Sequence, residues 1–327
     1  MSRPALAALT VCTLILLILP WIIGNEFYVN MASQVLIYAL FALSINMMLG
    51  YGGMVSLGHA GYLGIAGYAC IIATMAGYDQ LTAAIFAIAI STLSAAFFGV
   101  LSLRAPGLGF IMITLALGQI VWGVAYRAND LTGGDNGIRH PARPMPFGFD
   151  IRDAPSFYYF TLAVFAIALF FIWRFSRSPF GASLMGTRDQ PRRMRMLGHN
   201  VWLIRLITFV MAGFWGSVAS VLYVYYNLFL SPHAISLQQS AEILLMAILG
   251  GASTLTGPIV GAAIITLIKN VVSTYVERWN TLLGVIFVVA IVFMPYGLVP
   301  GCKQLWQRLW TRKRGKTTES TMAEPAQ

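Results

Sequence analysis

Three titratable side chains, Glu242, Lys269 and His59, lie inside long apolar segments of this 327-residue chain. An ionised side chain at the centre of a bilayer costs about 2.5–3.5 kcal/mol or more unless it finds water or a partner. Such residues are therefore candidates for a functional role, of which a proton relay is the simplest. Whether they can act together depends on how the segments that carry them are placed.

Glu242 and Lys269 each lie about six residues from the outer end of their segments, or roughly 9 Å at 1.5 Å per residue. Counted from the turn that joins the two segments, they differ by about five residues, so a direct ion pair would be strained. The commoner alternative is a Lys269 side chain that snorkels outward to the membrane surface. For His59, a structural hydrogen bond at a helix start is favoured over a proton relay.

Motifs of enzymes and of metal sites are missing from the sequence. The histidines are scattered, at His59, His140, His199 and His233. The chain has no His-Glu-x-x-His, no carboxylate pair within a helical turn of an apolar segment and no Gly-x-Ser-x-Gly. The glycine-rich TGGDNGI from Thr132 lacks the terminal Lys and Ser or Thr of a phosphate loop. Isolated cysteines, at Cys12, Cys70 and Cys302, suggest neither a disulfide framework nor a metal site. We expect a chain that is not an enzyme and holds no metal or cofactor; any ATP would be bound by another chain.

Composition predicts an all-α integral membrane protein. With 58% hydrophobic and 10% charged residues, a soluble globule could not hide the apolar surface. Apolar windows of about 17 to 23 residues predict about ten transmembrane helices. The windows are Ala5–Ile23, Asn30–Leu49, Ser56–Ala76, Leu81–Leu103, Gly107–Tyr126, Phe157–Arg174, Ile204–Tyr226, Ser236–Gly250, Thr256–Tyr275 and Thr281–Val299. The first window has no small-residue cleavage site and is expected to be a retained helix.

The distribution of basic residues predicts the orientation of these helices. If both termini are inside, fifteen of the 21 Lys and Arg lie at the cytoplasmic side, five lie outside and Lys269 lies within a span. The positive-inside rule therefore favours an N-in, C-in topology. It also accounts for the net charge of +10 without a nucleic-acid partner. Residues 127–156 become an outer loop, residues 175–203 a cytoplasmic loop, and residues 302–327 a basic, disordered cytoplasmic tail.

Glycine-broken segments occur in both halves of the chain and suggest a weak parallel repeat. Leu49–Gly53 precede SLGHAGYLGIAGY from Ser56, and about 200 residues later Leu249–Gly251 precede LTGPIVGAA from Leu255. Such duplicated, broken segments point to a transport pathway, although close helix packing through small residues is the favoured alternative. The pathway candidates are His59, Gly58, Gly61, Gly64, Glu242, Lys269, Gly250, Gly251 and Gly257.

The central loop, residues 175–203, is rich in arginine. Its charged part, Gly186 to Val201, carries four arginines against Asp189, and its apolar positions suggest a short amphipathic helix. These features are typical of a cytoplasmic docking segment, and they are equally typical of a loop that only sets topology.

An ordered set of motifs carries a family resemblance. The set consists of SLGHAGYLGIAGY from Ser56, RAPGLGFIMITLALGQI from Arg104, TGGDNGI from Thr132, the loop from Arg188 to Val201, LGGASTLTGPIVGA from Leu249 and MPYGL from Met294. From about Gln34 to Gly301, the chain resembles the branched-chain amino acid ABC-importer permeases, specifically the LivM-type subunit.

The resemblance implies the ABC-importer permease fold, with residues 1–301 as a transmembrane permease domain in a bacterial inner membrane. It implies a heterodimer with a paralogous permease, two cytoplasmic ATPase subunits and a periplasmic substrate-binding protein. The central loop would then be the ATPase-coupling segment, with Arg188, Asp189, Met194, Met196, Leu197 and Gly198 as its residues. Pro191, Arg192 and Arg193 depart from the family pattern, which has Glu and Ala there.

Two other classes of function remain open at this point. An ion-coupled secondary transporter acting without an ATPase would use Glu242, Lys269 and His59 as its relay. An assembly subunit would not need glycine-broken segments in both halves. The sequence does not identify the solute: branched-chain amino acids, urea, short amides and aromatic acids are all compatible with such a permease.

Overall fold

The computed structural model describes residues 20–21, 25–141, 153–272, 281, 284–286, 288 and 297–301. Long helices dominate these residues. They are α2 (Glu26–Asn46), α3 (Ala60–Met75), α4 (Gln80–Ser102), α5 (Leu108–Arg127), α7 (Ala154–Ser176), α10 (Val201–Asn227), α11 (Leu237–Gly250) and α12 (Thr256–Val272). Shorter elements are the π-helix η1 (Met47–Tyr51), α6 (Asn129–Thr132), the 3₁₀ helices η2 (Gly134–Asn136) and η4 (Pro232–Ile235), α8 (Pro179–Asp189), α9 (Pro191–Met196), and the strands β1 (Ile138–Arg139) and β2 (Phe229–Leu230).

Side-chain caps mark where several helices begin. Asn25 accepts a hydrogen bond from the Phe27 amide at the start of α2, and Asn200 accepts one from the Leu203 amide at the start of α10. Ser178 and Ser236 cap α8 and α11 in the same way. These side chains satisfy amides that have no partner within the helix, so each of these four helices begins where its sequence provides an acceptor.

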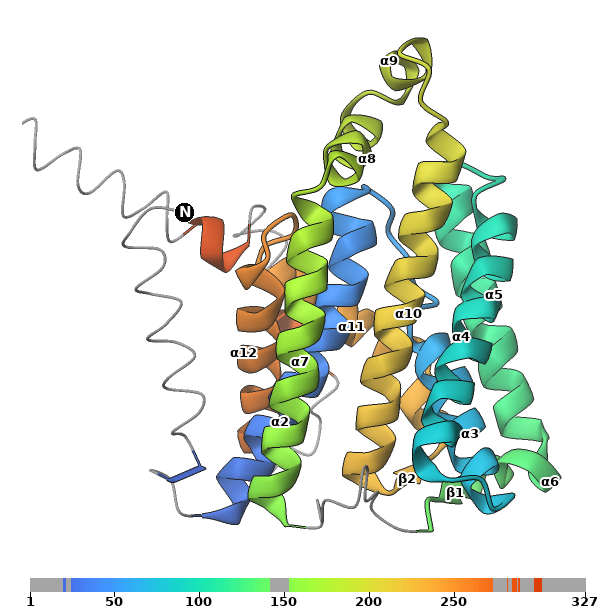
Figure 1. Cartoon of the computed structure of the whole chain (residues 1–327), viewed down its shortest axis with the longest axis vertical. Coiled ribbons are helices and arrows are strands. Elements are labelled where there is room, and N and C mark those ends of the chain that lie inside the picture. The colour runs from blue at the N-terminus through green and yellow to red at the C-terminus, as the bar shows by residue number, and fades with distance from the viewer. Residues whose placement is uncertain are drawn as a thin grey trace, which may run out of the picture.

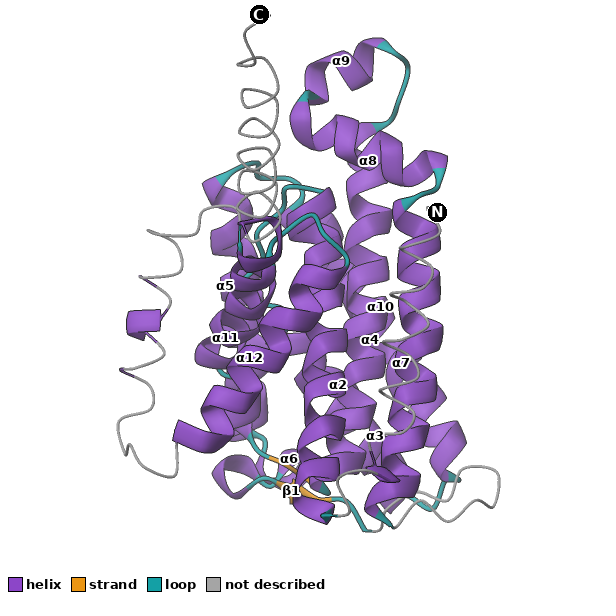
Figure 2. Cartoon of the chain, turned by 90° about the vertical axis from the view of Figure 1, so that its left-hand side faces the viewer, coloured by secondary structure: helices purple, strands orange, loops and turns teal. Residues whose placement is uncertain are grey.

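The helices surround α2, which is buried along most of its length (Figure 1). It contacts α7, α10, α11 and α12, while α10 also contacts α3 and α4, and α5 packs at the edge against α3 and α4. Helices α8 and α9 project from one end of the bundle, here called the loop end. The antiparallel pair β1–β2, with Ile138 opposite Leu230, lies at the other end, called the sheet end (Figure 2).

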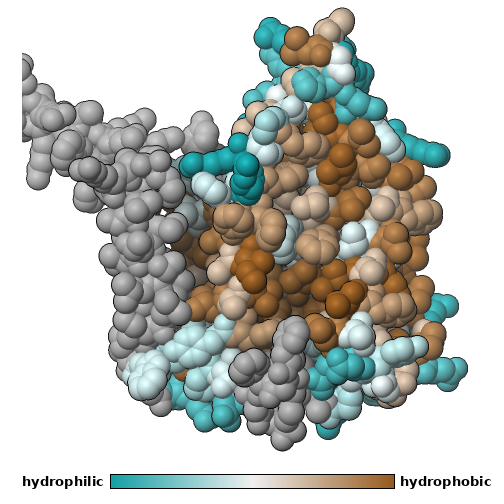
Figure 3. All heavy atoms as spheres, in the orientation of Figure 1, coloured by the Kyte–Doolittle hydropathy of each residue, from teal (hydrophilic) through white to brown (hydrophobic). Residues whose placement is uncertain are grey.

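Apolar side chains form a broad band between these two ends (Figure 3). Five of the described helices, namely α2 continued by η1, α4, α5, α7 and α10, are long and apolar enough to cross a membrane. Helices α3, α11 and α12 are apolar but shorter. These eight correspond to the second through ninth expected spans. The expected spans Ala5–Ile23 and Thr281–Val299 lie largely outside the described residues, and so do the tail 302–327 and residues 142–152 of the outer loop.

The third expected span begins later than its apolar run suggests. Residues 53–59 are not helical, and α3 starts at Ala60 although Ser56 and His59 are fully buried. The chain therefore returns from the loop end into the bundle as irregular backbone before α3 starts. Irregular backbone at such a depth needs hydrogen-bond partners within the protein. The amides of Leu57 and Ala60 donate to the hydroxyls of Thr114 and Ser240, respectively.

Candidate functional site

The two glycine-rich turns lie against each other at the loop end. Asn46, at the end of α2, donates from Nδ2 to the Thr254 carbonyl at 2.9 Å and accepts from the Ser253 amide at 3.2 Å. The Ser253 hydroxyl donates to the Gly50 carbonyl at 2.7 Å. A Cβ on Gly50 would overlap the Ser253 backbone, so glycine permits this approach. Segments about 200 residues apart in the sequence thus form one junction.

Arg188, at the end of α8, reaches into this junction. Its Nη1 donates to the Gly50 carbonyl at 2.6 Å and to the Ser253 hydroxyl at 3.0 Å, and its Nε contacts Asp189 at 2.8 Å. Its aliphatic stem covers Gly53, where a Cβ would collide with it. One guanidinium therefore ties the central loop to both turns. Arg188 faces the body of the protein, whereas Asp189 is exposed.

The tip of the central loop is α9 and the turn that follows it. Pro191 begins α9, which therefore stands apart from α8, where a single amphipathic helix was expected. Gly198 ends α9 with φ +83°, its amide bonded to the Arg195 carbonyl and the next amide to the Met194 carbonyl. Glycine is suited to this left-handed turn. The side chains of Met196 and Leu197 are 90% and 74% exposed.

Met194, which was expected in the coupling segment together with Met196 and Leu197, does not share their exposed apolar surface. Its side chain lies against α8, where a Cβ on Gly186 would touch the Met194 sulfur. The helix break at Pro191 turns α9 back towards α8, so Met194 faces inward while Met196 and Leu197 face outward. The name loop tip is used below for Met196, Leu197 and Gly198.

Glu242 and Lys269 form a direct ion pair. Lys269 Nζ lies 2.9 Å from both carboxylate oxygens, and the Glu242 side chain is 2% exposed. The strain expected from their offset of about five residues is relieved by side-chain direction, since Cβ atoms lean towards the N-terminus of their own helix. Helix α11 runs towards the loop end and α12 runs back, so the two side chains lean towards each other and close roughly 7.5 Å of offset. The structure therefore contains the ion pair, and the Lys269 side chain does not extend outward to the membrane surface.

His59 lies between α2 and α10, immediately before α3. Its Nε2 is 2.7 Å from the Ser44 hydroxyl, and its ring meets Tyr62 edge-on at 5.3 Å between centroids. Gly216 of α10 leaves room for it, because a Cβ there would lie 3.2 Å from Nε2. His59 therefore makes the structural hydrogen bond that was expected of it at the start of α3.

The candidate pathway glycines are sites of close packing within this chain. A Cβ on Gly58 would overlap the Thr114 carbonyl of α5, and Gly61 also faces α5. Gly64 faces Ile235 of η4. In the second half, Gly250, Gly251 and Gly257 lie against one another where α11 turns into α12. These contacts agree with the alternative that the glycines allow close helix packing. They do not test whether the same glycines line a pathway.

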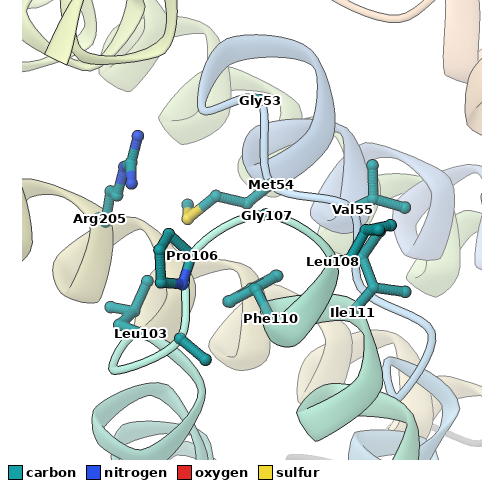
Figure 4. A pocket seen from close by; sticks show the side chains of 11 residues that line it. Gly53, Met54, Val55, Leu103, Pro106, Gly107, Leu108, Phe110, Ile111 and Arg205 are labelled. Carbon is teal, nitrogen blue, oxygen red and sulfur yellow. The ribbon is translucent and has the colours of Figure 1, made fainter.

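Two cavities with polar groups lie at opposite ends. At the loop end, about 380 Å³ is enclosed by the turn from Leu103 to Leu108, the segment from Gly53 to Val55, and α5 (Figure 4). Its lining is apolar apart from the Arg205 guanidinium at its edge. At the sheet end, a cavity of about 410 Å³ is lined by Phe27, Asn30, Met31, Gln34, Tyr226, Asn227 and Asn270.

Sequence reasoning missed the polar residues, most of them amides, that lie near the two ends of α2. Asn46 and Ser253 hold the junction, and Asn30, Gln34 and Asn270 line the cavity at the sheet end. A usable signal was present, because a polar amide inside a predicted span needs a partner just as a charge does.

Comparison with known proteins agrees with the resemblance drawn from the motifs. A family model described as branched-chain amino acid transport system, permease component, matches residues 27–294. The chain is 25% identical over 296 residues to the high-affinity branched-chain amino acid transport system permease protein LivM of Salmonella typhimurium, and equally to that of Escherichia coli. Each match covers 83% of this chain and 70% of the relative.

Among solved structures, PsaBC from Streptococcus pneumoniae in complex with Fab covers 75% of this chain and 90% of its own chain. Its sequence identity is 17% and its TM-score is 0.34. A likeness at that score supports no conclusion about this chain.

Proposed function

The chain belongs to the branched-chain amino acid transport permease family, and from this premise we propose that it is the membrane-spanning subunit of an ATP-binding cassette importer. It would form the translocation pathway together with a paralogous permease, for branched-chain amino acids or similar small polar solutes. A periplasmic binding protein would deliver the solute, and two separate cytoplasmic ATPase subunits would drive its uptake. The protein itself would hold no cofactor.

The observation that carries this proposal is the position of Arg188. An importer driven by separate ATPases needs a cytoplasmic element that can move the transmembrane helices as a rigid body. Helices α8 and α9 project from the loop end of the bundle (Figure 1), and Arg188 bonds α8 to the turns after α2 and α11. A loop that only set topology would need no such bonds. We propose that the ATPases dock on the loop tip and that Arg188 passes their movement to both turns.

The remaining features of the permease extend this proposal. The loop end would be cytoplasmic and the sheet end periplasmic, with about ten helices spanning the bacterial inner membrane, both termini inside and residues 302–327 as a cytoplasmic tail. Residues 1–301 would be the permease domain, with the turns at Gly50 and Gly250 as corresponding points of a parallel repeat. The outer loop, residues 127–156, would receive the binding protein; the pairing of β1 in this loop with β2 supports a defined surface there.

An ion-coupled transporter working alone is less well supported. Its relay would require Glu242, Lys269 and His59 to exchange protons. Glu242 and Lys269 neutralise each other, and His59 is bonded to Ser44. In the described part of the chain, no hydrogen bond connects His59 to the ion pair.

Docking of the ATPase subunits at the loop tip can be tested by replacing its exposed apolar side chains with charged ones. Met196→Asp combined with Leu197→Asp should weaken retention of the ATPase subunits by roughly tenfold or more, because central apolar anchors contribute about 1–2 kcal/mol each to an interface. Quantitative co-purification from detergent measures the effect, with Leu131→Asp, an exposed leucine at the sheet end, as the matched control. A full complement of ATPase on the double variant would contradict docking at this surface.

A further inference from the structure

Helix α5 lies at the edge of the bundle and is the least buried of the five described candidate membrane spans (Figure 1). One of its faces packs against α3 and α4; its buried residues are Phe110, Thr114, Gly118 and Ala125. At helical spacing, the opposite face, here called the open face, consists of Met112, Ala116, Gln119 and Gly123. A Cβ added at Gly123 would meet no atom within 4 Å. There is therefore free space beside this face.

Gln119 places an amide on the open face, well inside the membrane-spanning part of α5. It lies eight residues before Arg127, the last residue of the helix, which corresponds to roughly 12 Å along a helix of about 30 Å. Its side chain is partly exposed, and no hydrogen bond to it is seen within the described residues. An amide that faces hydrocarbon loses its bonds to water and gains none in return. Lipid is therefore an unsuitable neighbour for this face.

The exposed faces of α4 and α7 have the composition that suits contact with lipid. They are formed by large apolar side chains, such as Ile85, Phe86, Leu93 and Phe97 on α4, and Phe170 and Phe171 on α7. The hydroxyls of Thr92 and Ser94 donate to carbonyls of α4 itself, so they need no partner outside their helix. The open face of α5 differs from both, because its polar group has no such partner.

The chemistry of the open face suits a solute that passes through. An amide offers two donors and an acceptor with two lone pairs, so Gln119 can bond to water and to either charged end of a zwitterion. The open face carries no ionisable side chain. Glu242 and Lys269, which lie on α11 and α12, neutralise each other. A solute at Gln119 would therefore be bound weakly enough to leave, as transit through a membrane requires.

We propose that the open face of α5 lines the water-filled pathway and that Gln119 contacts the solute within the membrane. This inference rests on the proposed function, which requires a pathway, and it identifies the helix and the side chain that form one wall of it. The paralogous permease would provide the facing wall. The solute class that fits is small, without net charge and rich in hydrogen-bonding groups, such as a zwitterion or an amide, because an ion would find no opposite charge on this face.

A charged thiol reagent tests whether water reaches the open face, because it does not enter hydrocarbon. In a chain whose native cysteines are replaced by serine, Gln119→Cys or Ala116→Cys is introduced, and the complex of both permeases and the ATPases is reconstituted into proteoliposomes. A methanethiosulfonate with a quaternary ammonium, supplied on both sides, should modify each cysteine in at least one of two states, the nucleotide-free state and the state trapped with ATP and vanadate.

Ala89→Cys is the matched control for this reaction. Ala89 is exposed on α4 and lies nine residues from the sheet end of that helix, a depth close to that of Gln119. Its cysteine should stay unmodified. If Gln119→Cys does not react in either state, protein or lipid covers the open face and the inference is overturned. Equal reaction rates for Gln119→Cys and Ala89→Cys would overturn it as well, since the two faces would then be equally accessible.

Gln119→Met tests contact with the solute, because methionine has a similar size and lacks the amide. The maximal rate of ATP-driven uptake should fall by about two- to tenfold, as expected for one lost hydrogen bond. The concentration of loaded binding protein that gives half-maximal uptake should not change, because the outer surface is untouched. Gln119→Asn, which keeps an amide, should retain more of the rate. Uptake by Gln119→Met at the wild-type rate would overturn the contact with the solute.

The same proteoliposomes separate this inference from the function on which it rests. If uptake depends on ATP but Gln119→Cys stays unreactive, only the assignment of the pathway to α5 is wrong. If Gln119→Cys reacts but uptake does not depend on ATP, the proposed function is wrong, whereas the water-lined face of α5 stands.

Discussion

Arg188 connects the central loop to both glycine-rich turns of this molecule. Its guanidinium bonds to the backbone of the first glycine-rich turn, to Ser253 in the second and to Asp189 beside it. A planar guanidinium offers several donors in a fixed geometry, which suits it to hold three partners at once. The residue is only partly exposed, so these bonds are better shielded from water than those of a surface arginine.

We predict that Arg188→Gln lowers ATP-driven uptake by about tenfold or more, because each hydrogen bond to a charged group contributes about 1.5–3 kcal/mol. ATPase retention should remain normal, since the loop tip is untouched, and ATP hydrolysis should become uncoupled from uptake. Arg188→Lys should not restore uptake, because an ammonium cannot reproduce the planar arrangement of guanidinium donors. Uptake and hydrolysis measured in proteoliposomes test this, with the exposed Arg192→Gln as control. If the two glutamine variants transport equally well, Arg188 has no coupling role.

At the residue scale, the sequence indicated which side chains matter better than it indicated their contacts. Glu242 and Lys269 were found because charges stand out in an apolar run. Their pairing depends on the direction in which each side chain leans. This direction follows from the direction of each helix, whereas sequence separation gives only the offset along the helices. The direction of the Met194 side chain has a related cause, since the break at Pro191 determines which face of α9 is exposed.

Helices α3 and α5 illustrate how small residues set the packing of elements. Gly58, just before α3, faces the Thr114 carbonyl and Gly118 of α5, so the two backbones meet without side chains between them. Such contacts between small residues allow close approach of helices where no hydrophobic driving force acts between them. They hold the irregular segment before α3 in place, and with it His59.

Gly58→Ala should therefore lower stability by about 1–3 kcal/mol, the usual effect of overpacking, because the added methyl would overlap the Thr114 carbonyl. Gly123→Ala on α5 is the control: an added Cβ meets no atom within 4 Å, so that variant should be neutral or slightly stabilising. Thermal unfolding of the detergent-purified subunit compares them. Equal midpoints for the two variants would show that α5 can move away from Gly58 without a measurable effect on stability.

At the element scale, apolar runs predicted the eight long helices to within a few residues where the structure describes them. The start of α3 was the exception. The run from Ser56 is continuous in composition, so its pattern resembles a helix throughout, yet residues 53–59 are irregular. Hydrogen bonds from Thr114 and Ser240, distant in sequence, hold this segment, and a local pattern cannot reveal them.

Across the whole molecule, polar groups lie at two separate places joined by α2. The junction of the glycine-rich turns lies at its loop end, and the amide cavity lies near its sheet end. Helix α2 is buried between α7, α10, α11 and α12, so a displacement at one end must be accommodated by packed neighbours at the other. If ATPase subunits dock at the loop tip, as proposed above, their movement would therefore reach the sheet end through α2.

The orientation in the membrane is a prediction at the same scale. In a chain lacking its native cysteines, Asp135→Cys should react with an impermeant maleimide added from outside, and Thr318→Cys should react only after the membrane is opened. The physical reason is the split of fifteen inner against five outer basic residues. The reverse labelling pattern would contradict the N-in, C-in topology.

The most direct test of the central claim is the energy source of uptake. The complex of both permeases and the ATPases is reconstituted into proteoliposomes, with solute-loaded binding protein outside and nucleotide inside. We predict uptake that requires internal ATP, fails with a non-hydrolysable analogue and persists when ionophores collapse every ion gradient. Uptake that proceeds without ATP and stops when an ion gradient is collapsed would contradict the account and favour an ion-coupled transporter.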